Sequence, residues 1–137
     1  MSIRVTRVLV PGTAEGDVLV LDEPLSFWGG LDPDTGVVTD ARHPQRGAVL
    51  TGMVVVMRSG RGSSSSASVL AEAIRAGTGP AAIVLAEADP IVVLGALVAG
   101  ELYGIHVPVV EVAHDEDYEA ATRSRHLAIA DASIVAT

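Results

Sequence analysis

Four consecutive serines, Ser63 to Ser66, follow the segment Ser59-Gly60-Arg61-Gly62, and they are the residues best suited to do chemistry. Glycine lets a backbone bend sharply and lets a ligand approach it closely. The first N–H groups of a helix have no partner inside the helix, and the helix dipole is positive there. If a helix begins at these serines, a small anion could bind at its start, ringed by hydroxyl groups and with Arg58 close by in sequence.

The residues on either side of this turn predict a strand before it and a helix after it. Residues 53–57 (MVVVM) are apolar and β-branched, which is typical of a buried strand. Four apolar residues beyond the turn share one face of a helical wheel: Val69, Leu70, Ala73 and Ile74. Composition alone would also fit a flexible Ser-rich linker. A linker does not usually interrupt a strand–turn–helix unit, so we favour an ordered turn.

The serines lack an obvious activating group in the sequence. A serine hydroxyl is a weak nucleophile or base without help, and the chain has no lysine and no histidine within the turn. Helix N–H groups and arginines could instead stabilise an alkoxide. The four histidines are scattered and show no metal-binding spacing. His106 and His126 are expected to be structural or surface residues, and His43 is left open. The turn is therefore expected to need partners from elsewhere.

Composition narrows the class of protein. A chain of 137 residues, 49% of them hydrophobic, fits one domain, 1–137, with an aliphatic core. Its formal charge of −8 argues against nucleic acid as a partner. Without cysteine it can form no disulfide and supply no thiolate to an iron–sulfur cluster. The N-terminal residues lack the apolar segment of a signal peptide, and no apolar stretch is long enough to span a bilayer, so we expect a cytoplasmic location and no membrane partner.

The rest of the chain predicts alternating strands and helices after a β-rich first third. The expected strands are residues 3–10, 17–21, 81–85, 107–112, 127–129 and 133–135. The expected helices are 90–103, capped by Asp89, and 115–125. Residues 22–47 show little periodicity, but Phe27 and Trp28 favour an ordered loop over a mobile one. Alternation from Met53 onward predicts parallel βαβ units, in an α/β domain with an extra β layer.

Several motifs together resemble the small subunit of the aconitase X family. They occur in order over roughly residues 8–110, which makes the resemblance specific. The matching segments are LDEPLSFWGG (21–30), DPDTG (32–36), HPQ (43–45), SGRGSSSS (59–66), GTGPAAIV (77–84) and ELYGI (101–105).

The resemblance implies a swivelling β/β/α three-layer domain like the mobile small domain of aconitase. In that superfamily a Gly-x-Gly-Ser-Ser turn delivers a serine that takes a proton from the substrate. The match with residues 60–64 assigns this role to Ser63, with Arg61, Gly62, Ser64 and Ser65 as expected substrate contacts. Aconitase has a substrate-binding arginine where this chain has Ser65, so the ligand contacts must differ.

The resemblance also implies a partner and a substrate class. An aconitase X large subunit would carry the iron or iron–sulfur centre, this chain would bind none, and the chain alone would be inactive. Family members dehydrate cis-3-hydroxy-L-proline or mevalonate 5-phosphate. Nine arginines and no lysine suggest a GC-rich bacterial genome, which favours hydroxyproline. Two non-enzymatic alternatives are a phosphohistidine carrier domain, which would need a histidine where Ser63 stands, and an anion-binding module. The roles of Ser26, Trp28 and His43 stay open.

Overall fold

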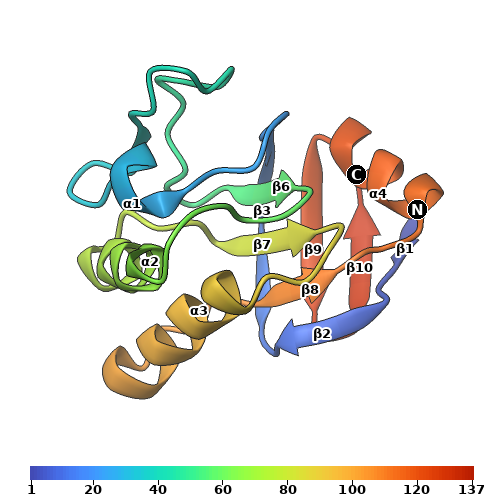
Figure 1. The fold of residues 1–137 in the computed structure, drawn as a ribbon. Helices are drawn as coiled ribbons and strands as arrows, with labels where there is room; N and C mark the ends of the chain where they lie inside the picture. The colour runs from blue at the N-terminus through green and yellow to red at the C-terminus, as the bar shows by residue number, and fades with distance from the viewer.

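One mixed eight-stranded sheet organises the structure, a computed structural model that describes residues 1–137 (Figure 1). The strand order is β1-β10-β9-β3-β6-β7-β8-β2. These strands are β1 (Ser2–Arg4), β2 (Arg7–Val10), β3 (Thr13–Val20), β6 (Val54–Met57), β7 (Ala82–Leu85), β8 (Val109–Glu111), β9 (His126–Ala130) and β10 (Ser133–Ala136). A separate two-stranded hairpin consists of β4 (Leu31–Asp32) and β5 (Val37–Val38). The helices are α1 (Phe27–Gly30), α2 (Ser65–Ala76), α3 (Pro90–Tyr103) and α4 (Asp115–Arg123).

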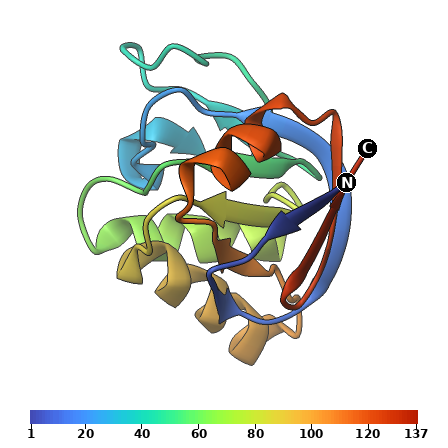
Figure 2. The ribbon, with the colours of Figure 1, turned by 90° about the vertical axis from the view of Figure 1, so that its right-hand side faces the viewer.

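The parallel strands β6, β7 and β8 are buried on both faces, as their continuous apolar sequences predict. Because successive side chains of a strand point to opposite faces, Val55 and Met57 of β6 join a core with α2 and α3. Val54 and Val56 join a second core with β9, β10 and α4. The result is a mixed α/β fold in layers, with α2 and α3 covering one side and β1, β9, β10 and α4 the other (Figures 1 and 2).

Helix α3 begins and ends where the sequence predicts, and α2 begins within the serine run. Asp89 caps α3, because its carboxylate accepts the backbone N–H groups of Ile91 and Val92 at 2.8 and 3.4 Å. Gly77 and Gly104 close α2 and α3 in the left-handed conformation that favours glycine. None of the helices is long and apolar enough to cross a membrane.

Three predictions about the sheet differ from the structure. The predicted single strand 3–10 is two strands, β1 and β2, separated by Val5 and Thr6. β1 pairs with β10 and β2 pairs with β8, so the two strands lie at opposite ends of the strand order. The Thr6 N–H bonds to the Glu111 carbonyl at 2.7 Å, and this pins the chain between the two strands. The parallel βαβ pattern expected from Met53 onward also stops at β8, since β9 pairs antiparallel with β3 and β10. The strand predicted at 17–21 starts earlier, at Thr13, because β9 supplies a partner for its first half.

The long segment before β6 is ordered, as the prediction from Phe27 and Trp28 required. Phe27 is fully buried in the core between the sheet and α2, and Trp28 points outward with 61% of its surface exposed. The predicted turn at 32–36 is present, with the Gly36 N–H bonded to the Asp32 carbonyl at 2.8 Å. This segment holds α1 against the start of α2, which is where the serines lie.

Candidate active site

The serine turn lies at the carboxyl end of β6 and leads directly into α2. Ligands of α/β proteins bind outside the carboxyl ends of the parallel strands, so this position suits a site. The helix begins at Ser65, with Ser64 at the position before it. Ser63, Ser64 and Ser65 are exposed, and Ser66 is buried with 2% of its surface accessible. The four serines therefore divide into three that face outward and one that faces the core.

Four successive backbone N–H groups, from Gly62 to Ser65, donate no hydrogen bond within the chain. The next N–H groups along the chain, those of Ser66 and Ala67, bond to the carbonyls of Ser63 and Ser64 at 3.0 and 3.1 Å. The hydroxyls of Ser63, Ser64 and Ser65 likewise have no partner in the chain. No acidic residue occupies the first turn of α2. The turn thus presents a concentrated set of donors at the positive end of a helix dipole.

The segment around α1 contacts the turn and supports it. The Ser66 hydroxyl accepts the Trp28 N–H at 3.2 Å and lies 3.3 Å from the Ser26 hydroxyl, which donates to the Trp28 carbonyl at 3.0 Å. Gly62 has φ +103°, and a Cβ on it would lie 2.3 Å from Ser26 Oγ. Glycine is strongly favoured at this position, since both the backbone conformation and the nearby Ser26 side chain oppose a Cβ.

The two arginines near the turn are already engaged with the protein. The Arg61 guanidinium donates to the Pro24 carbonyl at 2.9 Å, and the backbone N–H of Arg61 donates to the Leu25 carbonyl at 3.3 Å. Arg58 lies over the ring of Tyr118, 5.0 Å from its centroid. Burial raises the pKa of the Tyr118 phenol, and the nearby Arg58 charge opposes that rise. Arg61 stays beside the serines, whereas Arg58 belongs to a separate contact with α4.

The start of α3 lies against the same turn. A Cβ on Gly60 would be 2.6 Å from Asp89 Oδ2 and 2.8 Å from Val92 Cγ2. Asp89 in turn follows Ala88, whose N–H bonds to the buried carboxylate of Glu111 at 2.8 Å. The turn is therefore held between α1 on one side and the α3 N-terminus on the other.

His43 has a structural place in the long segment. Its Nδ1 accepts the Gln45 N–H at 3.0 Å, which assigns the proton to Nε2, and Nε2 donates to the Glu23 carbonyl at 2.8 Å. The side chain of Gln45 then bonds to Asp22 through both its amide nitrogen and its oxygen. The ring is buried and both nitrogens are used, so His43 orders the loop that carries α1.

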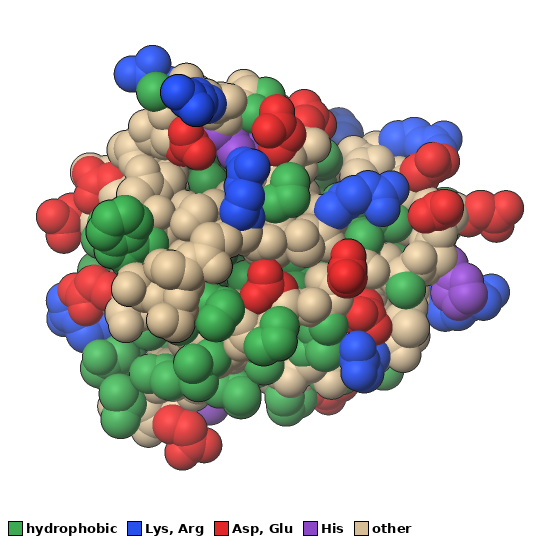
Figure 3. Space-filling model, in the orientation of Figure 1, with side chains coloured by type: hydrophobic (Ala, Val, Ile, Leu, Met, Phe, Trp, Pro, Cys, Tyr) green, Lys and Arg blue, Asp and Glu red, His purple; other side chains and the backbone are tan.

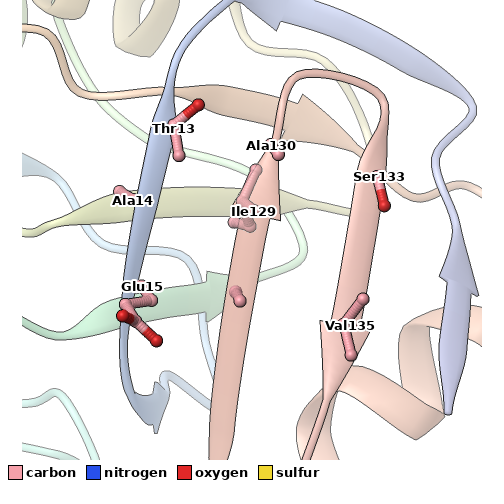
Figure 4. A pocket seen from close by; sticks show the side chains of 8 residues that line it. Thr13, Ala14, Glu15, Ile129, Ala130, Ser133 and Val135 are labelled. Carbon is pink, nitrogen blue, oxygen red and sulfur yellow. The ribbon is translucent and has the colours of Figure 1, made fainter.

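The largest hollow of the surface is elsewhere, on the outer face of β3, β9 and β10 (Figure 4). It measures about 440 Å³ and is lined by small or apolar side chains, with Glu15 at one end. None of the predicted site residues lines it. Beside it in the same sheet, His126 contacts Glu15 and Asp17 at 2.9 and 3.1 Å, and these hydrogen bonds raise the pKa of its imidazole.

The sequence did not single out Ser26 and Ser66 as a pair that shapes the turn. Ser66 was visible only as one of four serines, and Ser26 as a position of open role in the motif 21–30. They are 40 positions apart, and the fold alone brings their hydroxyls together. The available signal was that Ser26 lies in the motif 21–30, directly before Phe27 and Trp28.

No group of three or more His, Asp, Glu or Cys side chains on this chain could hold a metal ion. With no cysteine either, the donor set does not fit an iron–sulfur cluster.

The fold and the turn define a class: an α/β domain of swivel type that presents serines at the start of a helix. A family model described as the aconitase X swivel domain matches residues 3–137. The chain belongs to this family.

Two groups of relatives are similar to the chain. It is 48% identical over 105 residues to a cis-3-hydroxy-L-proline dehydratase of Pseudomonas aeruginosa, covering 77% of this chain and 18% of that protein. It is 43% identical over 94 residues to a phosphomevalonate dehydratase small subunit of Pyrococcus furiosus, covering 69% of this chain and 70% of the relative. The chain therefore spans under a fifth of the first relative's length.

The fold also matches a solved relative over its whole length. The crystal structure of Thermococcus kodakaraensis aconitase X in its holo-form superimposes with a TM-score of 0.84 at 30% sequence identity. That match covers 100% of this chain and 98% of the other. The expected swivel-domain fold is thereby confirmed.

Proposed function

We propose that this chain is the small subunit of a two-chain hydro-lyase that dehydrates a small hydroxy acid, with Ser63 as the proton acceptor. The observation that carries the proposal is the row of unpaired N–H groups around Ser63 in a chain of this family. Names of the relatives support it, since both groups are dehydratases and one is called a small subunit.

In this elimination of water, Ser63 acts as the base. Ser63 Oγ takes a proton from carbon, the electron pair of that C–H bond forms a double bond, and hydroxide leaves the neighbouring carbon. The serine must be an alkoxide to do so, and N–H groups at a helix start favour the charged form. Ser64 and Ser65 would bond the substrate through their hydroxyls, while Gly62 and Arg61 border it.

The metal centre and most of the substrate contacts would belong to an aconitase X large subunit. The donor set of this chain does not fit an iron or iron–sulfur centre, so we assign it no step through one. The isolated chain is expected to be inactive. We expect the complex to be cytoplasmic, with neither nucleic acid nor membrane as a partner.

We propose cis-3-hydroxy-L-proline as the substrate, with mevalonate 5-phosphate as the alternative. The turn offers hydroxyl and N–H donors but one cationic side chain, Arg61, which already bonds Pro24. Helix N–H groups can hold a carboxylate or a phosphate, so the preference rests on composition: nine arginines and no lysine suggest a GC-rich bacterial genome. The longer and more identical match to the hydroxyproline dehydratase of Pseudomonas aeruginosa supports the same choice.

The test is a co-expressed complex of this chain with the large subunit from the same genome. Turnover of both substrates would be followed by mass spectrometry as loss of water. Ser63→Ala should lower kcat by about 10²–10⁴-fold, the usual contribution of a positioned base. Ser68→Ala is the matched control, because Ser68 is an exposed serine one turn further along α2. Near wild-type turnover of Ser63→Ala would reject the assignment.

A further inference from the structure

Helix α3 is apolar on its outer face as well as its inner face. Its inner residues pack on the sheet and on α2, with Gly95 so close to Ala67 that a Cβ would lie 2.9 Å from that carbonyl. The chain carries no charged residue between Asp89 and Glu101. The exposed large side chains along the outer face and just beyond it are Leu94, Leu97, Leu102, Tyr103 and Ile105. A helix that is hydrophobic all round is normally covered on both sides.

The other two long helices have ordinary solvent-facing surfaces. Glu72 and Arg75 form an ion pair on the outer face of α2, and Glu119 and Arg123 do so on α4. In Figure 3 the hydrophobic side chains gather over α3 at the lower left, while charged side chains are scattered over the rest of the visible face. Contiguous apolar patches of this kind mark interaction sites.

The apolar face of α3 starts beside the serine turn. Asp89, which caps the helix, lies against Gly60, and Leu94 follows one turn into α3. A 14-residue helix is about 21 Å long, so the apolar face runs from the candidate active site to the opposite edge of the layer. A protein that covers the serines would therefore also contact the first turn of α3.

We infer that the outer face of α3 docks the large subunit, so that one interface both assembles the complex and closes the serine turn. This inference rests on the proposed function. In the Pseudomonas aeruginosa relative the segment similar to this chain is 18% of a single polypeptide, so the remainder is tethered to it. A second copy of this chain would cover α3 but would bring no metal site to the serines, because no side-chain cluster of this chain could hold a metal ion.

The experiment compares Leu94→Glu/Leu102→Glu with wild type for binding to the separately purified large subunit, by titration calorimetry and light scattering. Val49→Glu is the matched control, because Val49 and Leu94 are each 48% exposed. Val49 lies in the loop segment before β6, where the next residue, Leu50, bonds through its N–H to the Gly36 carbonyl. Losing two interface anchors should raise Kd at least about 100-fold. Val49→Glu should bind as wild type, and circular dichroism of each isolated chain checks that it folds.

The possible outcomes separate this inference from the proposed function. Wild-type affinity of the double variant overturns the role of α3, whatever the turnover. The role of α3 is also overturned if the wild-type chain dimerises alone while the double variant is monomeric and still binds the large subunit. That result identifies a second copy of this chain as the occupant of the α3 face. A complex that assembles through α3 but dehydrates neither substrate leaves the inference standing and rejects the function. Ser63→Ala should assemble normally.

Discussion

Gly62→Ala tests whether the serine turn is held by the contact between Gly62 and Ser26. The added Cβ would lie 2.3 Å from Ser26 Oγ and 2.9 Å from Ser26 Cβ, and it would have to adopt φ +103°. Positive φ costs a non-glycine residue about 1–2 kcal/mol, and overpacking adds about 1–3 kcal/mol. We therefore expect Gly62→Ala to lower the free energy of unfolding by about 2–5 kcal/mol, the sum of these two costs.

Gly47→Ala separates the two contributions. Gly47 has φ +92°, but a Cβ there would meet nothing within 4 Å, so only the backbone cost of about 1–2 kcal/mol applies. Removing the Ser26 side chain in Gly62→Ala/Ser26→Gly should recover the difference, which a double-mutant cycle measures.

Urea denaturation followed by circular dichroism gives the unfolding free energies, and the single tryptophan, Trp28, reports locally on α1 by fluorescence. In the complex, a displacement of the turn by about 1 Å should lower turnover about 100-fold. Equal destabilisation by Gly62→Ala and Gly47→Ala, with no recovery by Ser26→Gly, would refute the reasoning.

Two further changes test the surroundings of the site. Ser66→Ala removes the acceptor of the part-buried Trp28 N–H and should lower the unfolding free energy by about 0.5–1.5 kcal/mol. Ser65→Ala, at an exposed serine without a partner, should change it by less than about 0.5 kcal/mol. Equal values for the two variants would contradict the proposed support. Hydrogen bonds to Glu15 and Asp17 raise the pKa of the His126 imidazole. The protonated ring therefore stabilises the fold fully at a pH below its unfolded-state pKa of about 6.5. This stabilisation is lost as the pH rises through the higher folded-state pKa. The difference in thermal stability between wild type and His126→Gln should therefore shrink from pH 5 to pH 9, and a difference that grows would exclude this ion pairing.

Local sequence signals predicted the helices and the turn well. Asp89 with Pro90, and the glycines Gly77 and Gly104, fix helix ends through contacts within a few residues, so no knowledge of the sheet is needed. The apolar run at 53–57 likewise predicts β6, since a strand buried on both faces needs apolar residues at every position.

The order of the strands could not be predicted in the same way. Residues 3–10 read as one strand, because alternation says nothing of which neighbour each half pairs with. The antiparallel pairing of β9 with β3 joins segments more than a hundred residues apart, and only the folded sheet selects it. The exposed face of α3 was also invisible, since an apolar helix can be covered by its own chain or by another.

By itself the sequence determined that a strand, a glycine turn and serines lead into a helix, because glycine, serine and apolar periodicity act locally. The tertiary structure decided which serines face outward and which one is buried. Ser66 turns inward because the α1 segment supplies the Trp28 N–H and the Ser26 hydroxyl, and Gly62 gives that segment room. Four N–H groups are left free at Ser63 because no other part of the chain reaches them.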